Sequence, residues 1–141
     1  MGQSFKDVVA WQRAMQLTLA VDKLTAGFPD TERFGLTNQM RRAAVSVASN
    51  IAEGYGRSTK GEYVLFLGHA RGSCCELETQ ILIERELRMG TPENLEATSQ
   101  LCDDVGRLLG ALMKSLRSGK SSSPLVPQSL SPSSSQELAL P

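Results

Sequence analysis

The segment that decides the fold lies at residues 34–57 and reads FGLTNQMRRAAVSVASNIAEGYGR. Its apolar residues recur every three or four positions, which is the period of one face of an α-helix. This stripe comprises Leu36, Met40, Ala43, Val47 and Ile51. The cluster Gly54-Tyr55-Gly56 then ends the pattern, because glycine favours helix termination. The segment therefore predicts an amphipathic helix with one buried face.

Three more amphipathic helices are predicted around this segment. The first begins at a Ser-x-x-Asp motif at Ser4 and ends before Pro29. The third follows a capping box at Thr59 and runs to Gly90. The fourth begins at Thr91-Pro92, a helix-capping threonine followed by a first-turn proline, and continues to residue 117.

Short turns between these helices predict an all-α fold, an antiparallel up-down-up-down four-helix bundle over residues 1–117. Only 5% of the residues are aromatic, which disfavours a β-sandwich or a small barrel. Residues 118–141 are rich in serine and proline and poor in charge. We expect this C-terminal segment to be a disordered tail, because its few apolar residues cannot offset the entropy cost of ordering it.

The 15 basic and 15 acidic side chains give a formal net charge of zero, so a partner recruited by strong overall charge is excluded. No apolar run reaches the roughly 18 residues of a membrane span, and the N-terminus does not resemble a signal peptide. We therefore expect a cytoplasmic protein without a membrane partner.

The residue types that usually carry catalysis or bind metals are sparse. His69 is the single histidine, so the paired Glu-x-x-His motifs of metal-binding bundles cannot form. Cys74 and Cys75 are adjacent, and a helix turns them about 100° apart, so they cannot chelate one ion together. With Cys102 they are expected to be reduced and partly buried thiols. These observations predict no enzymatic activity, no cofactor and no metal.

A polar stripe on the predicted helix at residues 34–57 is the strongest candidate for a binding site. The stripe comprises Arg42, Ser46, Ser49, Asn50, Glu53 and Arg57. From residue 41 to residue 60 the chain carries four bases and one acid. The predicted nucleic-acid contacts, each on a phosphate, are Arg41, Arg42, Arg57 and Lys60. The alternative is a salt-bridge network in which Arg42 or Arg57 pairs with Glu53, Glu62 or Glu76.

Apolar residues beyond those needed for a single core also indicate self-association. Trp11 and Met15 widen the apolar face of the first helix, and Ile83 with Leu87 does the same on the third.

Residues 5–15, which read FKDVVAWQRAM, and the segment at 34–57 resemble a bacterial family of four-helix bundle proteins encoded in intervening sequences of 23S ribosomal RNA genes, also called S23 ribosomal-type. The resemblance covers about residues 4–117. Residues 102–110, CDDVGRLLG, are also similar to the accessory protein of diversity-generating retroelements, which belongs to the same superfamily. The resemblance implies a homopentamer. For the accessory branch it implies a basic outer surface that binds RNA or DNA and associates with a reverse transcriptase.

Two hypotheses follow from these observations. The first is a non-catalytic, homo-oligomeric bundle that binds structured nucleic acid, above all RNA, as an accessory factor. Recognition would follow backbone geometry, because the basic stripe has few exposed aromatic side chains on which bases could stack, Tyr55 being the exception. The second is a structural assembly or protein-adaptor module whose arginines lie in subunit-interface salt bridges.

Overall fold

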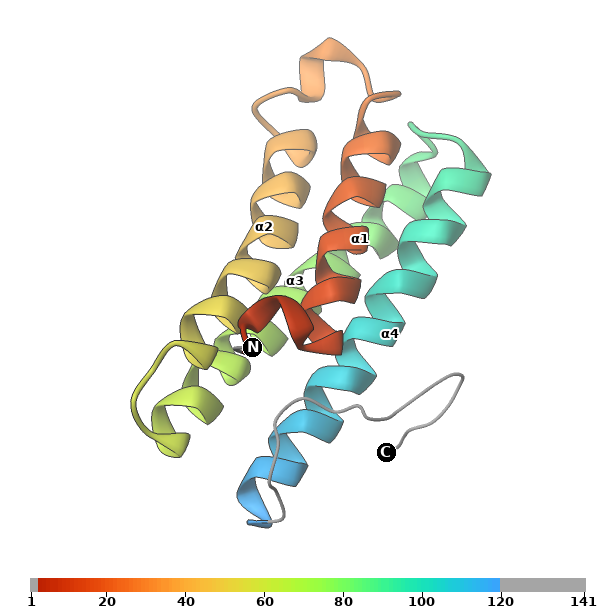
Figure 1. The fold of residues 1–141 in the computed structure, drawn as a ribbon. Coiled ribbons are helices and arrows are strands. Elements are labelled where there is room, and N and C mark those ends of the chain that lie inside the picture. Colours follow the sequence, from red (N-terminus) through yellow and green to blue (C-terminus); the bar gives the residue numbers. More distant parts are fainter. Residues whose placement is uncertain (1–2, 120–141) are drawn as a thin grey trace.

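A computed structural model describes residues 3–119 as four α-helices and two short 3-10 turns, with no strand in this part of the chain (Figure 1). The helices are α1 (Val9–Thr25), α2 (Leu36–Tyr55), α3 (Lys60–Leu87) and α4 (Pro92–Arg117). The predicted all-α four-helix fold is confirmed. Of the predicted tail, residues 120–141 lie outside the described residues.

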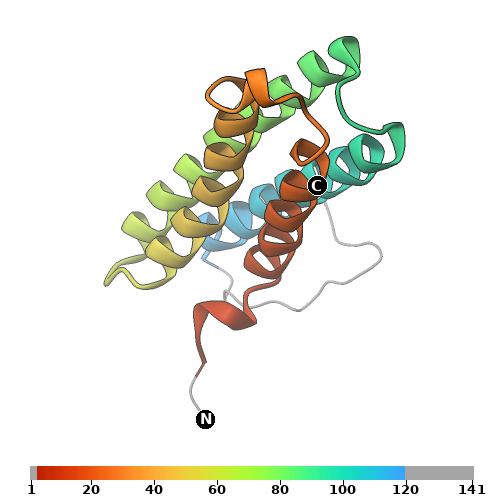
Figure 2. The ribbon, with the colours of Figure 1, turned by 90° about the horizontal axis from the view of Figure 1, so that it is seen from above.

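Each helix packs against two neighbours, so that α1 contacts α2 and α4, and α3 contacts α2 and α4. Consecutive helices run in opposite directions, and α1 and α3 lie diagonally across the bundle (Figures 1 and 2). A single core fills the space between them, built from the apolar stripes of all four helices. Its most deeply buried large side chains include Leu17, Met40, Ile51, Leu67 and Leu109.

The two later helix starts lie where their capping residues predict. The hydroxyl of Thr59 accepts a hydrogen bond from the amide of Glu62, and that of Thr91 accepts one from the amide of Asn94. Pro92 occupies the first turn of α4, where its missing N–H removes no helical hydrogen bond.

The first helix begins later than the Ser-x-x-Asp motif suggests. Ser4 and Asp7 do form a reciprocal capping box, but it caps a 3-10 turn over Phe5–Asp7. Val8 then has an extended backbone and is 1% exposed, and α1 starts at Val9. A β-branched residue tolerates extended backbone well, so burying Val8 in the core separates the turn from the helix.

Gly54 lies at the closest approach between α2 and α3. A methyl group at this position would stand 2.9 Å from Cβ of Phe66 and 3.1 Å from Cδ1 of Tyr63. The glycine therefore lets the end of α2 pack directly on the start of α3, which brings the Arg57 region against the aromatic side chains of α3.

Candidate nucleic-acid interface

Arg41 lies at the seam between α1 and α2. Its Nε donates a hydrogen bond of 2.9 Å to Oγ1 of Thr25 and lies 3.5 Å from Oδ1 of Asp22. The side chain remains 44% exposed, so the contact is a surface ion pair with one hydrogen bond. Arg41 therefore links the two helices and has part of its guanidinium at the surface.

Arg57 follows the C-terminal end of α2 and is held from two sides. Its Nη2 lies 3.6 Å from Oε2 of Glu53, one helical turn earlier. Its guanidinium carbon stands 4.6 Å from the ring centroid of Phe66 on α3, within cation–π range. The Phe66 ring in turn meets His69 edge to face at 5.5 Å. This stack gives Arg57 a defined orientation at the end of the bundle.

Arg42 and Lys60 are exposed, and neither makes an ion pair with a residue in the 3–119 range. Arg42 lies on the outer face of α2, and Lys60 is the first residue of α3. Both charges are therefore directed to solvent.

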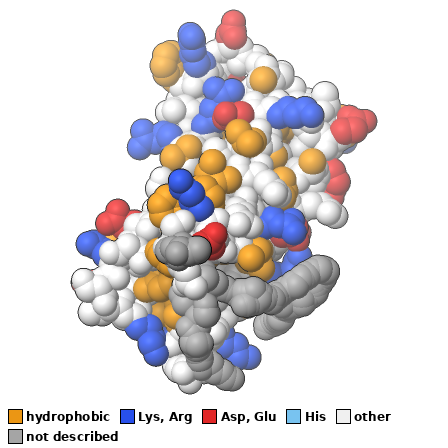
Figure 3. All heavy atoms as spheres, viewed as in Figure 1, with side chains coloured by type: hydrophobic (Ala, Val, Ile, Leu, Met, Phe, Trp, Pro, Cys, Tyr) orange, Lys and Arg blue, Asp and Glu red, His pale blue; other side chains and the backbone are white. Residues whose placement is uncertain are grey.

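The four predicted contacts form two pairs at opposite ends of α2. With a rise of about 1.5 Å per residue, Arg42 lies roughly 20 Å along the axis from the end of the helix, where Arg57 and Lys60 follow. In Figure 3, which shows the face over α1, the visible lysine and arginine side chains of the described residues are scattered among acidic ones and form no continuous patch.

The polar stripe predicted on α2 divides between solvent and the α2–α3 seam. Oγ of Ser46 lies 2.8 Å from Oγ of Ser73 on α3, and Nδ2 of Asn50 donates to Ser46 Oγ at 3.0 Å. Arg42, Ser49 and Glu53 stay on the exposed side. The division arises because α3 packs close to one edge of the stripe. The periodicity within α2 alone cannot reveal this packing.

Phe66 was not predicted as part of the site. Its signal was present, because Phe66 and His69 are three residues apart and so share one face of α3. What the sequence did not indicate is that Arg57, from the preceding turn, packs over that face.

A second feature, a groove between α3 and α4, has a volume of about 530 Å³. Ten residues line it: Arg71, Cys74, Cys75, Glu78, Cys102, Asp103, Gly106, Arg107, Gly110 and Ala111. The thiols of Cys74 and Cys102 are 3.9 Å apart at its base. Both residues belong to the core stripes of adjacent antiparallel helices, but their contact depends on the axial register of α3 against α4, which the sequence does not give.

Within residues 3–119, no three histidine, cysteine, aspartate or glutamate side chains are grouped so that they could hold a metal ion. The four helices of this part of the chain also include none long and apolar enough to cross a membrane.

The helix order, the antiparallel neighbours and the capped turns place this chain in the class of antiparallel four-helix bundles. Residues 6–111 match the family model described as 23S rRNA-intervening sequence protein. The chain belongs to that family. No curated protein is significantly similar to it in sequence.

A solved structure shares this fold. It is a protein of unknown function from the S23 ribosomal protein family of Bacteroides thetaiotaomicron, with a TM-score of 0.69 and 19% sequence identity. The superposition covers 78% of this chain and 99% of the other. At this level of identity the likeness concerns the fold.

Proposed function

We propose that this protein is a non-catalytic, homo-oligomeric accessory factor of the cytoplasm that binds structured RNA through the phosphate backbone. The observation that carries the proposal is the exposure of Arg42 and Lys60, whose charges are not neutralised by another described side chain. Arg41 and Arg57 contribute the exposed parts of their guanidinium groups. Arginine suits this role because its planar fork donates to two phosphate oxygens at once.

Homo-oligomerisation is supported by exposed apolar side chains on two diagonally opposed helices. Met15 and Leu19 lie on α1 and are 39% and 64% exposed, and Ile83 and Leu87 lie on α3 and are 45% and 54% exposed. Hydrophobic side chains are visible over the middle of the α1 face in Figure 3. Two different apolar faces suit a heterologous contact, which closes into a ring when the rotation permits, and a pentamer is the ring we propose.

Oligomerisation would also supply the affinity that one protomer lacks. Two separated pairs of cations per chain are a weak polyanion site, but a ring repeats them, and binding at one protomer raises the effective concentration of RNA at the next. A neutral chain can in this way bind a polyanion through repeated local sites. A reverse transcriptase is the protein partner to test, on the strength of the resemblance to retroelement accessory proteins.

The proposal is tested with the double variant Arg42→Gln plus Lys60→Gln in a mobility-shift assay on a structured RNA. Lys114→Gln plus Arg117→Gln is the matched control, because it removes two exposed cations from the end of α4. We expect at least a tenfold loss of affinity for the first variant, little change for the second, and unchanged oligomer size by light scattering for both. Equal affinity of the first variant and the wild type would refute the proposed contacts.

The alternative function is a structural assembly or protein-adaptor module. Its observation is that Arg41 and Arg57 pair within the protomer with Asp22 and Glu53, which reduces the charge that these two arginines offer to RNA. Arg41→Glu plus Arg57→Glu separates the two functions. If this variant dissociates into monomers, the arginines serve assembly, whereas an intact oligomer without RNA binding supports the accessory-factor proposal.

A further inference from the structure

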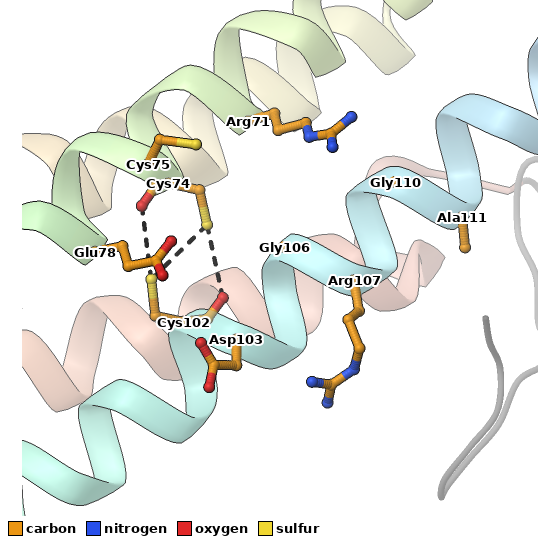
Figure 4. A pocket seen from close by; sticks show the side chains of 10 residues that line it. All are labelled: Arg71, Cys74, Cys75, Glu78, Cys102, Asp103, Gly106, Arg107, Gly110 and Ala111. Atoms are coloured by element: carbon orange, nitrogen blue, oxygen red, sulfur yellow. Dashed lines mark hydrogen bonds between the residues drawn. The ribbon is translucent and has the colours of Figure 1, made fainter. Parts of the chain in front are cut away.

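Cys74 of α3 and Cys102 of α4 form a pair of buried thiols that face each other. Their Sγ atoms are 3.9 Å apart. Each thiol also lies 3.7 Å from the backbone carbonyl oxygen of the other residue, as the dashed lines of Figure 4 show. A disulfide has an S–S distance of about 2.05 Å, so the sulfur atoms need to approach by roughly 2 Å.

A route for a small oxidant reaches this pair. Cys74 and Cys102 are each 4% exposed, yet both line the groove between α3 and α4. Gly106 and Gly110 form part of its α4 wall, and a methyl group added at either would meet no atom within 4 Å. The wall is therefore open above the thiols, which leaves space for a molecule of the size of hydrogen peroxide.

We propose that Cys74 and Cys102 form a reversible oxidation site, at which a hydroperoxide converts the two thiols into a disulfide that joins α3 to α4. In the first step one of the two thiolates attacks one peroxide oxygen, the O–O bond breaks, and the leaving oxygen takes a proton, which leaves a sulfenic acid on that cysteine. In the second step the thiolate of the other cysteine attacks the sulfur of the sulfenic acid. The S–S bond forms, the S–O bond breaks, and hydroxide leaves as water with the proton from the second thiol. Two thiols are oxidised by two electrons, and hydrogen peroxide is reduced to two molecules of water.

Both thiols have the same geometry, so either can attack first. Each is 4% exposed, and each lies 3.7 Å from the backbone carbonyl oxygen of the other residue. The hydrogen bond between the thiols lowers the pKa of Cys74, while burial and the nearby Glu78 and Asp103 act in the opposite direction. The thiolate is the nucleophile, and the other thiol resolves the sulfenic acid.

Cys75 is exposed and lines the same groove, so the test uses a Cys75→Ser background that removes its competing reactivity. The full-length variant is treated with hydrogen peroxide under native conditions, and unreacted thiols are blocked. We expect the loss of both remaining thiols without covalent dimers. Trypsin should then release residues 72–85 linked to residues 89–107, because Arg71, Arg85, Arg88 and Arg107 border those peptides. Dithiothreitol should restore both thiols, and oxidation should raise the melting temperature by several degrees until the reductant is added.

Two single-cysteine variants test for the sulfenic acid. With Cys102→Ser or Cys74→Ser added, the remaining thiol has no resolving partner, so at least one of the two variants should accumulate a sulfenic acid that dimedone traps. The proposal is overturned if both thiols stay reduced at peroxide concentrations that oxidise Cys75 in the wild type. It is also overturned if the linked peptides form only after denaturation, or if dimedone labels neither single-cysteine variant.

Discussion

The carboxylate of Glu84 accepts a hydrogen bond of 2.7 Å from the backbone amide of Gly90 and one of 3.3 Å from the amide of Met89. Glu84 is fully buried, and the chain between it and Gly90 turns through Arg88, whose φ of 55° is left-handed. A methyl group on Gly90 would stand 2.6 Å from Cδ1 of Leu24. One acidic side chain thus closes the turn from α3 to α4 against the end of α1.

Glu84→Ala is expected to lower the free energy of unfolding by about 2–3 kcal/mol, because two backbone amides lose a charged acceptor. Glu86→Ala, an exposed glutamate in the same turn of α3, should change it by less than about 0.5 kcal/mol. Urea denaturation followed by circular dichroism measures both. Equal stability of the two variants would contradict a structural role for the buried carboxylate.

Gly54→Ala and Gly72→Ala should change the free energy of unfolding in opposite directions. At Gly54 the added methyl group meets Phe66 and Tyr63, so we expect a loss of about 1–3 kcal/mol from overpacking. At Gly72, within α3, the methyl group meets no atom within 4 Å. The higher helix propensity of alanine should therefore raise the free energy of unfolding by about 0.5–1 kcal/mol. Thermal unfolding of the two variants provides the comparison, and a stabilised Gly54→Ala protein would be inconsistent with the close approach of α2 and α3.

Tyr63→Phe should stabilise the protein by about 1 kcal/mol at neutral pH, since its buried hydroxyl has no hydrogen-bond partner among residues 3–119. Burial, with a smaller contribution from Tyr55, also raises the pKa of Tyr63 above its ordinary value. The unfolded chain therefore releases this proton first, so Tyr63 lowers stability as the pH rises above about 10. The variant should lose less stability than the wild type in that range.

Tyr55→Phe is the control for this effect, because Tyr55 is only partly buried and its hydroxyl is not among the unsatisfied buried groups of the described residues. In urea titrations at neutral and alkaline pH it should keep most of the wild-type loss of stability, because burial, which this change leaves in place, is the larger cause of the raised pKa of Tyr63. If the free energies of unfolding of Tyr63→Phe and the wild type fall in parallel above pH about 10, this would contradict the raised pKa of Tyr63.

RNA binding should weaken with salt in proportion to the phosphate contacts made. Each contact contributes about 0.7 to 0.9 to the slope of log K against log salt concentration. Arg42→Gln plus Lys60→Gln should therefore reduce the slope by about 1.4 to 1.8 for each protomer engaged. Fluorescence anisotropy at several salt concentrations measures the slope. An unchanged slope would mean that these two side chains do not contact phosphates.

Local signals in the sequence predicted most of the helix starts, because a capping hydrogen bond connects residues only three positions apart. Thr59 and Thr91 cap α3 and α4 as expected. Ser4 shows the limit of such signals. Its capping box is formed, but α1 begins only at Val9, after the buried Val8. A local motif predicts a turn of helix, whereas packing decides how far the helix continues.

The sequence by itself determined four amphipathic helices and their antiparallel order, since apolar periodicity and short turns act within or between consecutive segments. Only the tertiary structure decided that Arg41 contacts Thr25, that Arg57 covers Phe66, and that the thiols of Cys74 and Cys102 meet. These contacts depend on the rotation of each helix about its axis and on the axial register between neighbours. Both are fixed by how the whole core packs, which no single segment specifies.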